Sequence, residues 1–169
     1  VQDAAAAMAV RVLDPQPGEV IADLCAAPGG KTLQLAAAGA RVIALDISAQ
    51  RLTRVAENLA RCGLAAELVA GDALEWRPTQ PLDAVLLDAP CSATGTIRRH
   101  PELPLIRDGA GLADLTALQA RLLDHALTML KPGGRLVYAT CSLLLAEGED
   151  QLAAALSRHP DLSVEPPQA

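Results

Sequence analysis

Five short apolar runs alternate with helix-like segments along this chain of 169 residues. The runs lie at 20–24, 41–45, 66–70, 82–87 and 135–139. They consist mainly of Val, Ile, Leu and Ala, as expected for strands that are buried on both faces. Helices between successive strands cover the two faces of a parallel sheet. The sequence therefore predicts an α/β fold in which a mostly parallel sheet carries helices on both faces.

Local signals mark the ends of the expected helices. Ser48 is a good N-cap for a helix that runs to Arg61, and Gly63 should end it. The periodic segment from Ala113 to Leu130 predicts a long helix that Pro132-Gly133-Gly134 ends. Further helices are expected at 4–12, 31–38 and 147–157. The first of these is apolar but too short to span a bilayer, so we expect a buried helix there and no membrane contact.

Composition limits how such a domain could hold nucleic acid. The chain has a net charge of −6, one Trp (Trp76), one Tyr (Tyr138) and no Phe. Aromatic stacking platforms and a broad basic face are therefore both excluded. The one local concentration of positive charge is Arg98-Arg99-His100, which we expect to contact RNA phosphates if RNA is bound. Another segment or domain would then supply most phosphate contacts.

The four cysteines are far apart and form no CxxC or Cys/His cluster. This spacing predicts no disulfide framework and no metal site, and it suits a reducing, cytoplasmic location. Cys62, on a helix, is expected to be a small core residue.

Reactive and acidic residues follow the strands. Asp46, Asp72, Asp88 and Cys141 each come just after a predicted strand, and so does the loop Cys25–Lys31. Ligands of parallel sheets bind outside the carboxyl ends of the strands. We therefore expect these residues to converge on one edge of the sheet.

Three interpretations compete for the first loop. Gly30-Lys31-Thr32 matches the end of a phosphate-binding P-loop, but Cys25 stands at its first glycine position and Pro28 removes an amide donor. The dinucleotide pattern GxGxxG does not occur. The third interpretation is a nucleoside without phosphates, because small residues let the backbone approach a ligand closely.

S-adenosylmethionine fits this third interpretation. Asp46 could accept hydrogen bonds from two ribose hydroxyls, and Asp72 could accept one from the adenine amine. The cationic sulfonium and ammonium groups suit a cleft lined by carboxylates. The alternative is that each Asp only caps a helix or turn, the commoner role of a lone Asp.

Three motifs resemble those of the RNA (cytosine-5)-methyltransferases of the Sun/Nol/Nop type, and most of all the bacterial group that methylates small-subunit ribosomal RNA. They are Asp23-Leu24-Cys25-Ala26-Ala27-Pro28-Gly29-Gly30-Lys31-Thr32, Asp88-Ala89-Pro90-Cys91-Ser92-Ala93-Thr94-Gly95 and Ala139-Thr140-Cys141-Ser142. The resemblance covers nearly the whole chain and implies a Rossmann-like class I methyltransferase fold. Members usually also carry an N-terminal helical RNA-binding domain and a final strand pair. Neither is visible here, so residues 1–169 are expected to be the catalytic domain of a longer protein, acting as a monomer.

The resemblance also implies a site. S-adenosylmethionine, which would leave as S-adenosylhomocysteine, would contact Cys25, Ala26, Ala27, Pro28, Gly29, Gly30, Lys31, Asp46, Asp72 and Asp88, with no metal. Cys141 would be the nucleophile, and Cys91 would help to release the product.

The chemistry accounts for these residue types. C5 of cytosine is too weak a nucleophile to take a methyl group directly, but addition of a thiolate at C6 makes it an enamine carbon. We expect the pKa of Cys141 to lie below its ordinary value of about 8.5. Asp88 would protonate or hydrogen-bond N3, and Cys91 would accept the C5 proton. Two alternatives are an inactive cofactor-binding RNA-assembly module and an enzyme that acts on another base or on protein.

Overall fold

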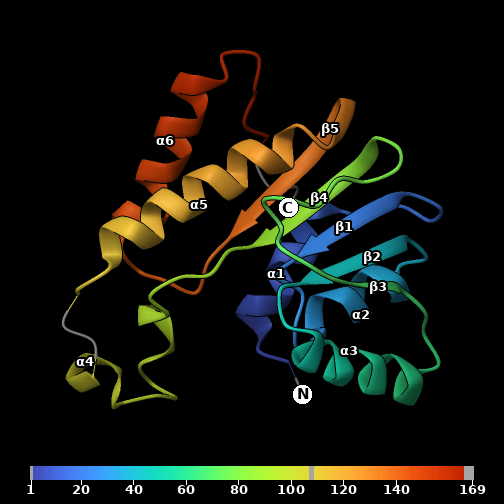
Figure 1. The fold of residues 1–169 in the computed structure, drawn as a ribbon, viewed down its shortest axis with the longest axis horizontal. Helices are drawn as coiled ribbons and strands as arrows, with labels where there is room; N and C mark the ends of the chain where they lie inside the picture. Colours follow the sequence, from blue (N-terminus) through green and yellow to red (C-terminus); the bar gives the residue numbers. More distant parts are fainter. Residues whose placement is uncertain (1, 107–108, 166–169) are drawn as a thin grey trace.

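The computed structural model describes residues 2–106 and 109–165, in which five strands form one parallel sheet (Figure 1). The strands are β1 (Val20–Leu24), β2 (Arg41–Asp46), β3 (Glu67–Ala70), β4 (Leu82–Asp88) and β5 (Leu130–Ala139). Their order is β3-β2-β1-β4-β5, and all four neighbouring pairs run parallel. The strand order therefore reverses between β1 and β4, which is where parallel sheets bind ligands. The predicted α/β fold is confirmed.

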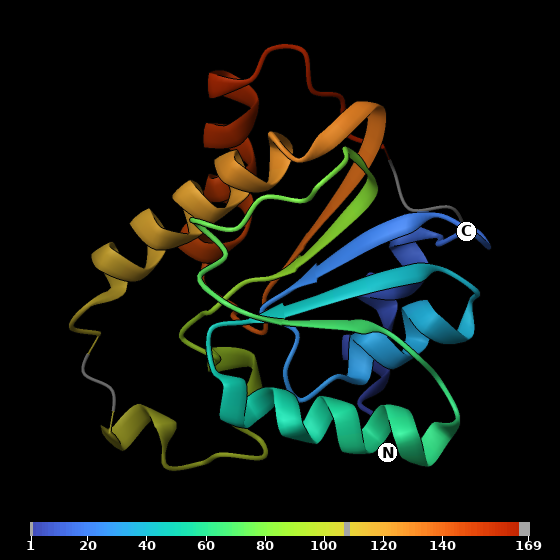
Figure 2. The same ribbon diagram turned by 45° about the vertical axis from the view of Figure 1, so that its right-hand side comes forward.

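Helices cover both faces of the sheet (Figure 2). Helices α1 (Ala4–Leu13) and α2 (Gly30–Ala37) pack on one face, and α5 (Leu112–Leu127) packs on the other, with α6 (Glu149–Arg158) against α5. Alternate residues of β4 enter the two cores. Ala84 and Leu86 pack with α1 and α2, whereas Val85 and Leu87 pack with α5. Truncating a fully buried leucine such as Leu86 to alanine would cost about 2–5 kcal/mol.

Helix α3 (Ala49–Cys62) forms as its end signals predict. Ser48 Oγ accepts a hydrogen bond from Arg51 N at 3.2 Å, and Gly63 ends the helix with φ +64°. The buried residues Leu52, Val55 and Leu59 recur at helical spacing along one face. Val55 packs directly against the loop after β1, so α3 supports the candidate site.

Three elements differ from the sequence-based expectation. Helix α5 ends at Leu127, and β5 begins at Leu130 rather than Arg135. Leu130 pairs with Leu82 and Arg135 with Ala84, so a bulge in β5 accommodates the Pro-Gly-Gly segment. Helix α1 is also less buried than expected, because only Val10 and Leu13 face the core.

The segment after β4 contains the short helices η1 (Thr94–Thr96) and α4 (Leu103–Ile106), and η2 (Leu145–Glu147) follows β5. The segment with η1 and α4 lies beyond the arrowheads of the strands (Figure 2).

Candidate functional site

The carboxyl ends of the strands lie level with one another. Leu24 of β1 pairs with Leu45 of β2 and with Leu87 of β4, and Asp88 pairs with Ala139 of β5. The residues that follow these pairs therefore lie along one edge of the sheet. This is the convergence that the sequence led us to expect for Cys25, Asp46, Asp88 and Cys141.

The loop after β1 is held by hydrogen bonds from its backbone amides to the end of β2. Ala26 N donates to Leu45 O at 3.0 Å, and Ala27 N donates to Asp46 Oδ2 at 3.1 Å. The Ala27–Pro28 peptide bond is cis. Gly29 is the N-cap of α2 with φ +98°, and a Cβ there would lie 2.9 Å from Val55 Cγ1. Glycine is therefore required by both backbone conformation and space.

Asp46 and Asp72 both accept backbone hydrogen bonds of the capping kind that a lone Asp commonly makes. The Asp46 side chain is buried and accepts from Ser48 N at 3.0 Å, with Arg51 Nη1 3.5 Å from the same oxygen. Asp72 Oδ1 accepts from Leu74 N at 2.8 Å. Each carboxylate oxygen retains further acceptor capacity, so these bonds leave room for a ligand's donors.

Lys31 links the two strands at the point where the strand order reverses. Its Nζ donates to Asp88 Oδ2 at 2.7 Å, and the Lys31 side chain is only 14% exposed. The ion pair joins the first turn of α2, which follows the loop after β1 in sequence, to the end of β4. Lys31 and Asp88 therefore lie together, although the sequence assigned them to the site separately.

Cys91 and Cys141 are brought together from positions 50 residues apart, with 3.3 Å between their Sγ atoms. The hydrogen bond from the Cys141 thiol lowers the pKa of Cys91 to about 6. The same contact, followed by burial, raises the pKa of Cys141. The direction expected for Cys141 is therefore reversed, because its neighbour takes the thiolate role.

Cys62 is exposed, so its expected place in the core is wrong.

The two cysteine loops also touch through their backbones. Gly95 N donates to Cys141 O at 2.8 Å, and a Cβ on Gly95 would lie 2.8 Å from the same oxygen. Ser92 Oγ lies 3.1 Å from Ser142 Oγ. A side chain at position 95 would therefore push the two loops apart.

Comparison with known proteins identifies the family. A sequence profile described as 16S rRNA methyltransferase RsmB/F matches residues 10–169. The chain is 52% identical over 166 residues to ribosomal RNA small subunit methyltransferase B from Serratia proteamaculans, which covers 95% of this chain. The chain belongs to the 16S rRNA methyltransferase RsmB/F family.

The chain is also similar in fold and sequence to solved structures. NSun6 from Pyrococcus horikoshii, solved with SFG, has a TM-score of 0.84 and 34% identity, with 93% of this chain and 41% of that chain covered. A methyltransferase homolog protein from the same organism has a TM-score of 0.80 and 39% identity, covering 92% of this chain and 50% of that one. The present chain spans 39% of the length of the Serratia relative.

Arg98, Arg99 and His100 of this RsmB/F member lie just after η1 and are exposed. His100 Nδ1 lies 3.3 Å from Glu102 Oε1, and within residues 2–106 and 109–165 the two guanidinium groups make no ion pair. Over the same residues there is no cluster of three or more metal-ligating side chains. None of the helices described there has the length and apolar character to cross a membrane.

Sequence reasoning missed two buried carboxyl groups, Asp23 and Glu147, both fully shielded from solvent. Asp23 Oδ2 accepts from Thr32 Oγ1 at 2.5 Å, and Oδ1 has no hydrogen-bond partner in the described chain. Burial raises the pKa of Asp23 to about 7. The available signal was an acidic residue inside the apolar run of β1. No comparable signal marked Glu147, which the sequence places at the start of a helix.

Proposed function

We propose that residues 1–169 form the catalytic domain that transfers a methyl group from S-adenosylmethionine to C5 of a cytosine in small-subunit ribosomal RNA. The names of the curated relatives support the RNA class. The observation that carries the chemistry is the 3.3 Å contact between Cys91 and Cys141. Two adjacent thiols suit a reaction in which one forms a covalent bond and the other moves a proton.

The residues present fit the proposed cofactor. Asp23 Oδ1 is a buried acceptor without a partner in the described residues, and β1 lies between the strands that end in Asp46 and Asp88. We assign the loop 25–31 to the methionine and ribose moieties, Asp46 to the ribose hydroxyls and Asp72 to the adenine amine. When bound, S-adenosylmethionine supplies an electrophilic methyl group on a sulfonium. The carboxylates along the edge favour that positive charge.

The thiols divide the covalent work. Cys141 gives up its thiol proton to water, and Cys91, whose Sγ lies 3.3 Å away, acts only in the later proton transfer. The Cys141 thiolate then forms a bond to C6, while Asp88 holds a proton or hydrogen bond at N3, so that the electron pair of the C5–C6 double bond becomes available at C5. After methyl transfer, Cys91 takes the C5 proton. The double bond re-forms as Cys141 leaves as thiolate.

Arg98 and Arg99 are proposed to contact RNA phosphates. They begin three residues after Gly95, which touches the Cys141 backbone. Replacing either arginine with alanine should weaken RNA binding. It should also reduce the slope of the logarithm of the binding constant against the logarithm of the salt concentration by about the share of one phosphate contact.

The test is a covalent trap. The full-length protein would be incubated with S-adenosylmethionine and RNA that contains 5-fluorocytosine, and then run on a denaturing gel. Fluorine at C5 cannot leave as a proton, so attack by Cys141 should accumulate as a stable adduct that Cys141→Ala lacks. If no adduct forms while cofactor binding is retained, the chain is a binding module or acts on another target atom, and the proposal fails.

A further inference from the structure

Glu147 is a buried carboxylate that the proposed reaction does not use. Its side chain receives three hydrogen bonds from two different segments. Ser92 N donates to Oε1 at 2.9 Å, Ser92 Oγ donates to Oε2, and Gln119 Nε2 donates to Oε1 at 2.8 Å. Ser92 directly follows Cys91. A residue on η2, after β5, therefore holds the loop after β4.

Glu147 is an anion in this setting. Burial raises the pKa of Glu147, but hydrogen bonds from serine side chains, the Ser92 backbone and Gln119 outweigh that effect and lower it overall. No cation of the described chain forms an ion pair with it. An ionised carboxylate can only accept hydrogen bonds, and here every partner is a donor.

The acceptor-only carboxylate sets the direction of a chain of hydroxyl groups. Ser92 has one proton and gives it to Glu147, so its oxygen is left to accept from Ser142 Oγ, which lies 3.1 Å away and also lowers the pKa of Glu147 by hydrogen bonding. Ser142 Oγ in turn accepts from Leu144 N and from Thr94 Oγ1, both at 3.1 Å. The chain thus ties the residue after Cys91 to the residue after Cys141.

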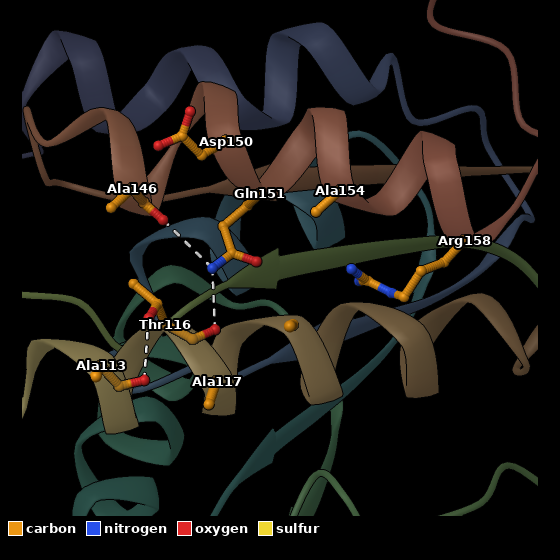
Figure 3. A pocket seen from close by; sticks show the side chains of 9 residues that line it. Ala113, Thr116, Ala117, Ala146, Asp150, Gln151, Ala154 and Arg158 are labelled. Atoms are coloured by element: carbon orange, nitrogen blue, oxygen red, sulfur yellow. Dashed lines mark hydrogen bonds between the residues drawn. The ribbon is translucent and has the colours of Figure 1, made fainter.

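Strand β5 and helices α5 and α6 keep the segment around Glu147 in place. The hydroxyl of Tyr138 on β5 donates to Glu147 O at 2.9 Å. Figure 3 shows Gln151 of α6 between the two helices, where its Nε2 donates to Thr116 O at 2.9 Å and to Ala146 O at 3.3 Å. The hollow of about 350 Å³ around this bond is lined by none of the strand-end residues. Gln119 also donates to Pro90 O at 2.8 Å.

We propose that Glu147 is a positioning residue that holds Cys91 against Cys141, an inference that rests on the proposed function for its catalytic meaning. Its carboxylate fixes the loop after β4 through Ser92 and the loop after β5 through Ser142. The sulfur-to-sulfur contact of 3.3 Å follows from this clamp. Without the carboxylate, the hydroxyl chain has no fixed direction and the two loops are free to separate.

The first test needs no RNA. Phenylarsine oxide bridges two nearby thiols: two As–S bonds form, and its oxygen leaves as water with the two thiol protons. In the full-length protein it should protect Cys91 and Cys141 together from iodoacetamide, as read by peptide mass spectrometry. Losing the hydrogen bonds of the clamp in Glu147→Ala should raise the concentration for half protection by about tenfold. Glu147→Gln, which keeps one accepting oxygen, should raise it by about threefold.

The matched control is Glu19→Gln. Glu19 is also hydrogen-bonded and pairs with Arg135 at 2.8 Å, but it precedes β1 at the opposite edge of the sheet. This variant should lower the melting temperature while leaving arsenical protection as in the wild type. Protection of both Glu147 variants at the wild-type concentration would overturn the proposal. So would an equal loss of protection in Glu19→Gln.

The second test uses the reaction. Glu147→Gln should slow release of the adduct with ordinary cytosine by about tenfold, because Cys91 no longer faces the reacting carbon. It should slow adduct formation on 5-fluorocytosine RNA by no more than about threefold. Equal slowing of both steps would contradict a positioning role exerted through Cys91. If the wild type forms no adduct at all, the proposed function fails, and the arsenical result still decides whether Glu147 holds the thiols together.

Discussion

The edge of the sheet has two sides that use the same residue types in opposite ways. On the cofactor side, after β1 to β3, burial raises the pKa of Asp23 to about 7 and that of Cys25 to about 12. On the thiol side, after β4 and β5, hydrogen bonding lowers the pKa of Cys91 to about 6 and also lowers that of Glu147. Among these four groups, the shifts favour the neutral forms of Asp23 and Cys25 and the charged forms of Cys91 and Glu147.

The difference follows from the number of donors that face each group. Asp23 receives one hydrogen bond, from Thr32, and its other oxygen has no partner in the described residues. Glu147 is also shielded from solvent, but it receives several hydrogen bonds. Burial alone favours the neutral form, whereas several donors reverse that preference. The cofactor side is therefore suited to receive positive charge from a ligand. On the thiol side, Cys91 and Glu147 already favour their charged forms.

The largest expected effect separates the two cysteines of the thiol side. Cys141→Ala should reduce methyl transfer at least about 10⁴-fold, as loss of a nucleophile does in covalent catalysis. Cys91→Ala should also stop turnover, but with the covalent RNA adduct trapped. A denaturing gel with ordinary cytosine RNA distinguishes them, with Cys62→Ala, an exposed helical cysteine, as the unaffected control. Identical gels for the two thiol-side variants would remove the division of labour.

On the cofactor side, Asp23→Asn should change the pH dependence of stability. The folded-state pKa of about 7 lies above the unfolded value of about 3.9, so the folded protein binds the proton more tightly. The contribution of Asp23 to stability is therefore greatest below pH 4 and falls by about 1.4 kcal/mol per pH unit up to pH 7, roughly 4 kcal/mol in all. Urea unfolding of the wild type should show this fall, and Asp23→Asn should abolish it. Asp83→Asn is the control of opposite sign, because hydrogen bonds from Lys131 and Val20 lower the pKa of Asp83. A stability difference between the wild type and Asp23→Asn that does not change between pH 4 and 7 would refute the assignment of a raised pKa to Asp23.

The sequence predicted the sheet and the strand-end residues because both follow from periodicity. Apolar runs broken by Gly, Pro and Asp determine where strands end, and parallel pairing then brings Asp46, Asp88 and Cys141 to one edge. The bulge in β5 was not predictable from Pro132 and the glycines, because pairing of Leu130 with Leu82 depends on tertiary structure.

Glu147 and the pKa directions lay beyond sequence reasoning for a related reason. Whether a buried carboxylate is charged depends on which donors reach it, and Ser92 and Gln119 approach Glu147 from 55 and 28 residues away. The same holds for Cys141, whose pKa is raised by a thiol 50 residues distant. Motifs locate such residues without showing which of them carries a proton.

Thiol alkylation compares the two sides directly. At pH 7, Cys91 with a pKa of about 6 is mostly thiolate, whereas Cys25 with a pKa of about 12 is almost entirely thiol. The lower nucleophilicity of a low-pKa thiolate offsets part of this difference, which leaves iodoacetamide about 100-fold faster at Cys91. Peptide mass spectrometry measures both rates. In Cys141→Ala the ratio of the alkylation rates at Cys91 and Cys25 should fall, because the thiol that lowers the pKa of Cys91 is gone. An unchanged rate there would show that another group stabilises the Cys91 thiolate.

The smallest expected effect concerns the outer part of the cofactor side. Asp72 already accepts from Leu74 N at 2.8 Å, so a ligand amine would be a further donor to a carboxylate that the loop holds in place. Asp72→Ala should weaken binding of S-adenosylhomocysteine by about tenfold, the value of one good hydrogen bond to a charged acceptor. Isothermal titration calorimetry on the full-length protein measures this, with Glu67→Ala, an exposed carboxylate at the opposite end of β3, as the control. Equal affinities for the two variants would reduce Asp72 to a turn-forming residue and leave adenine recognition to the backbone of the edge.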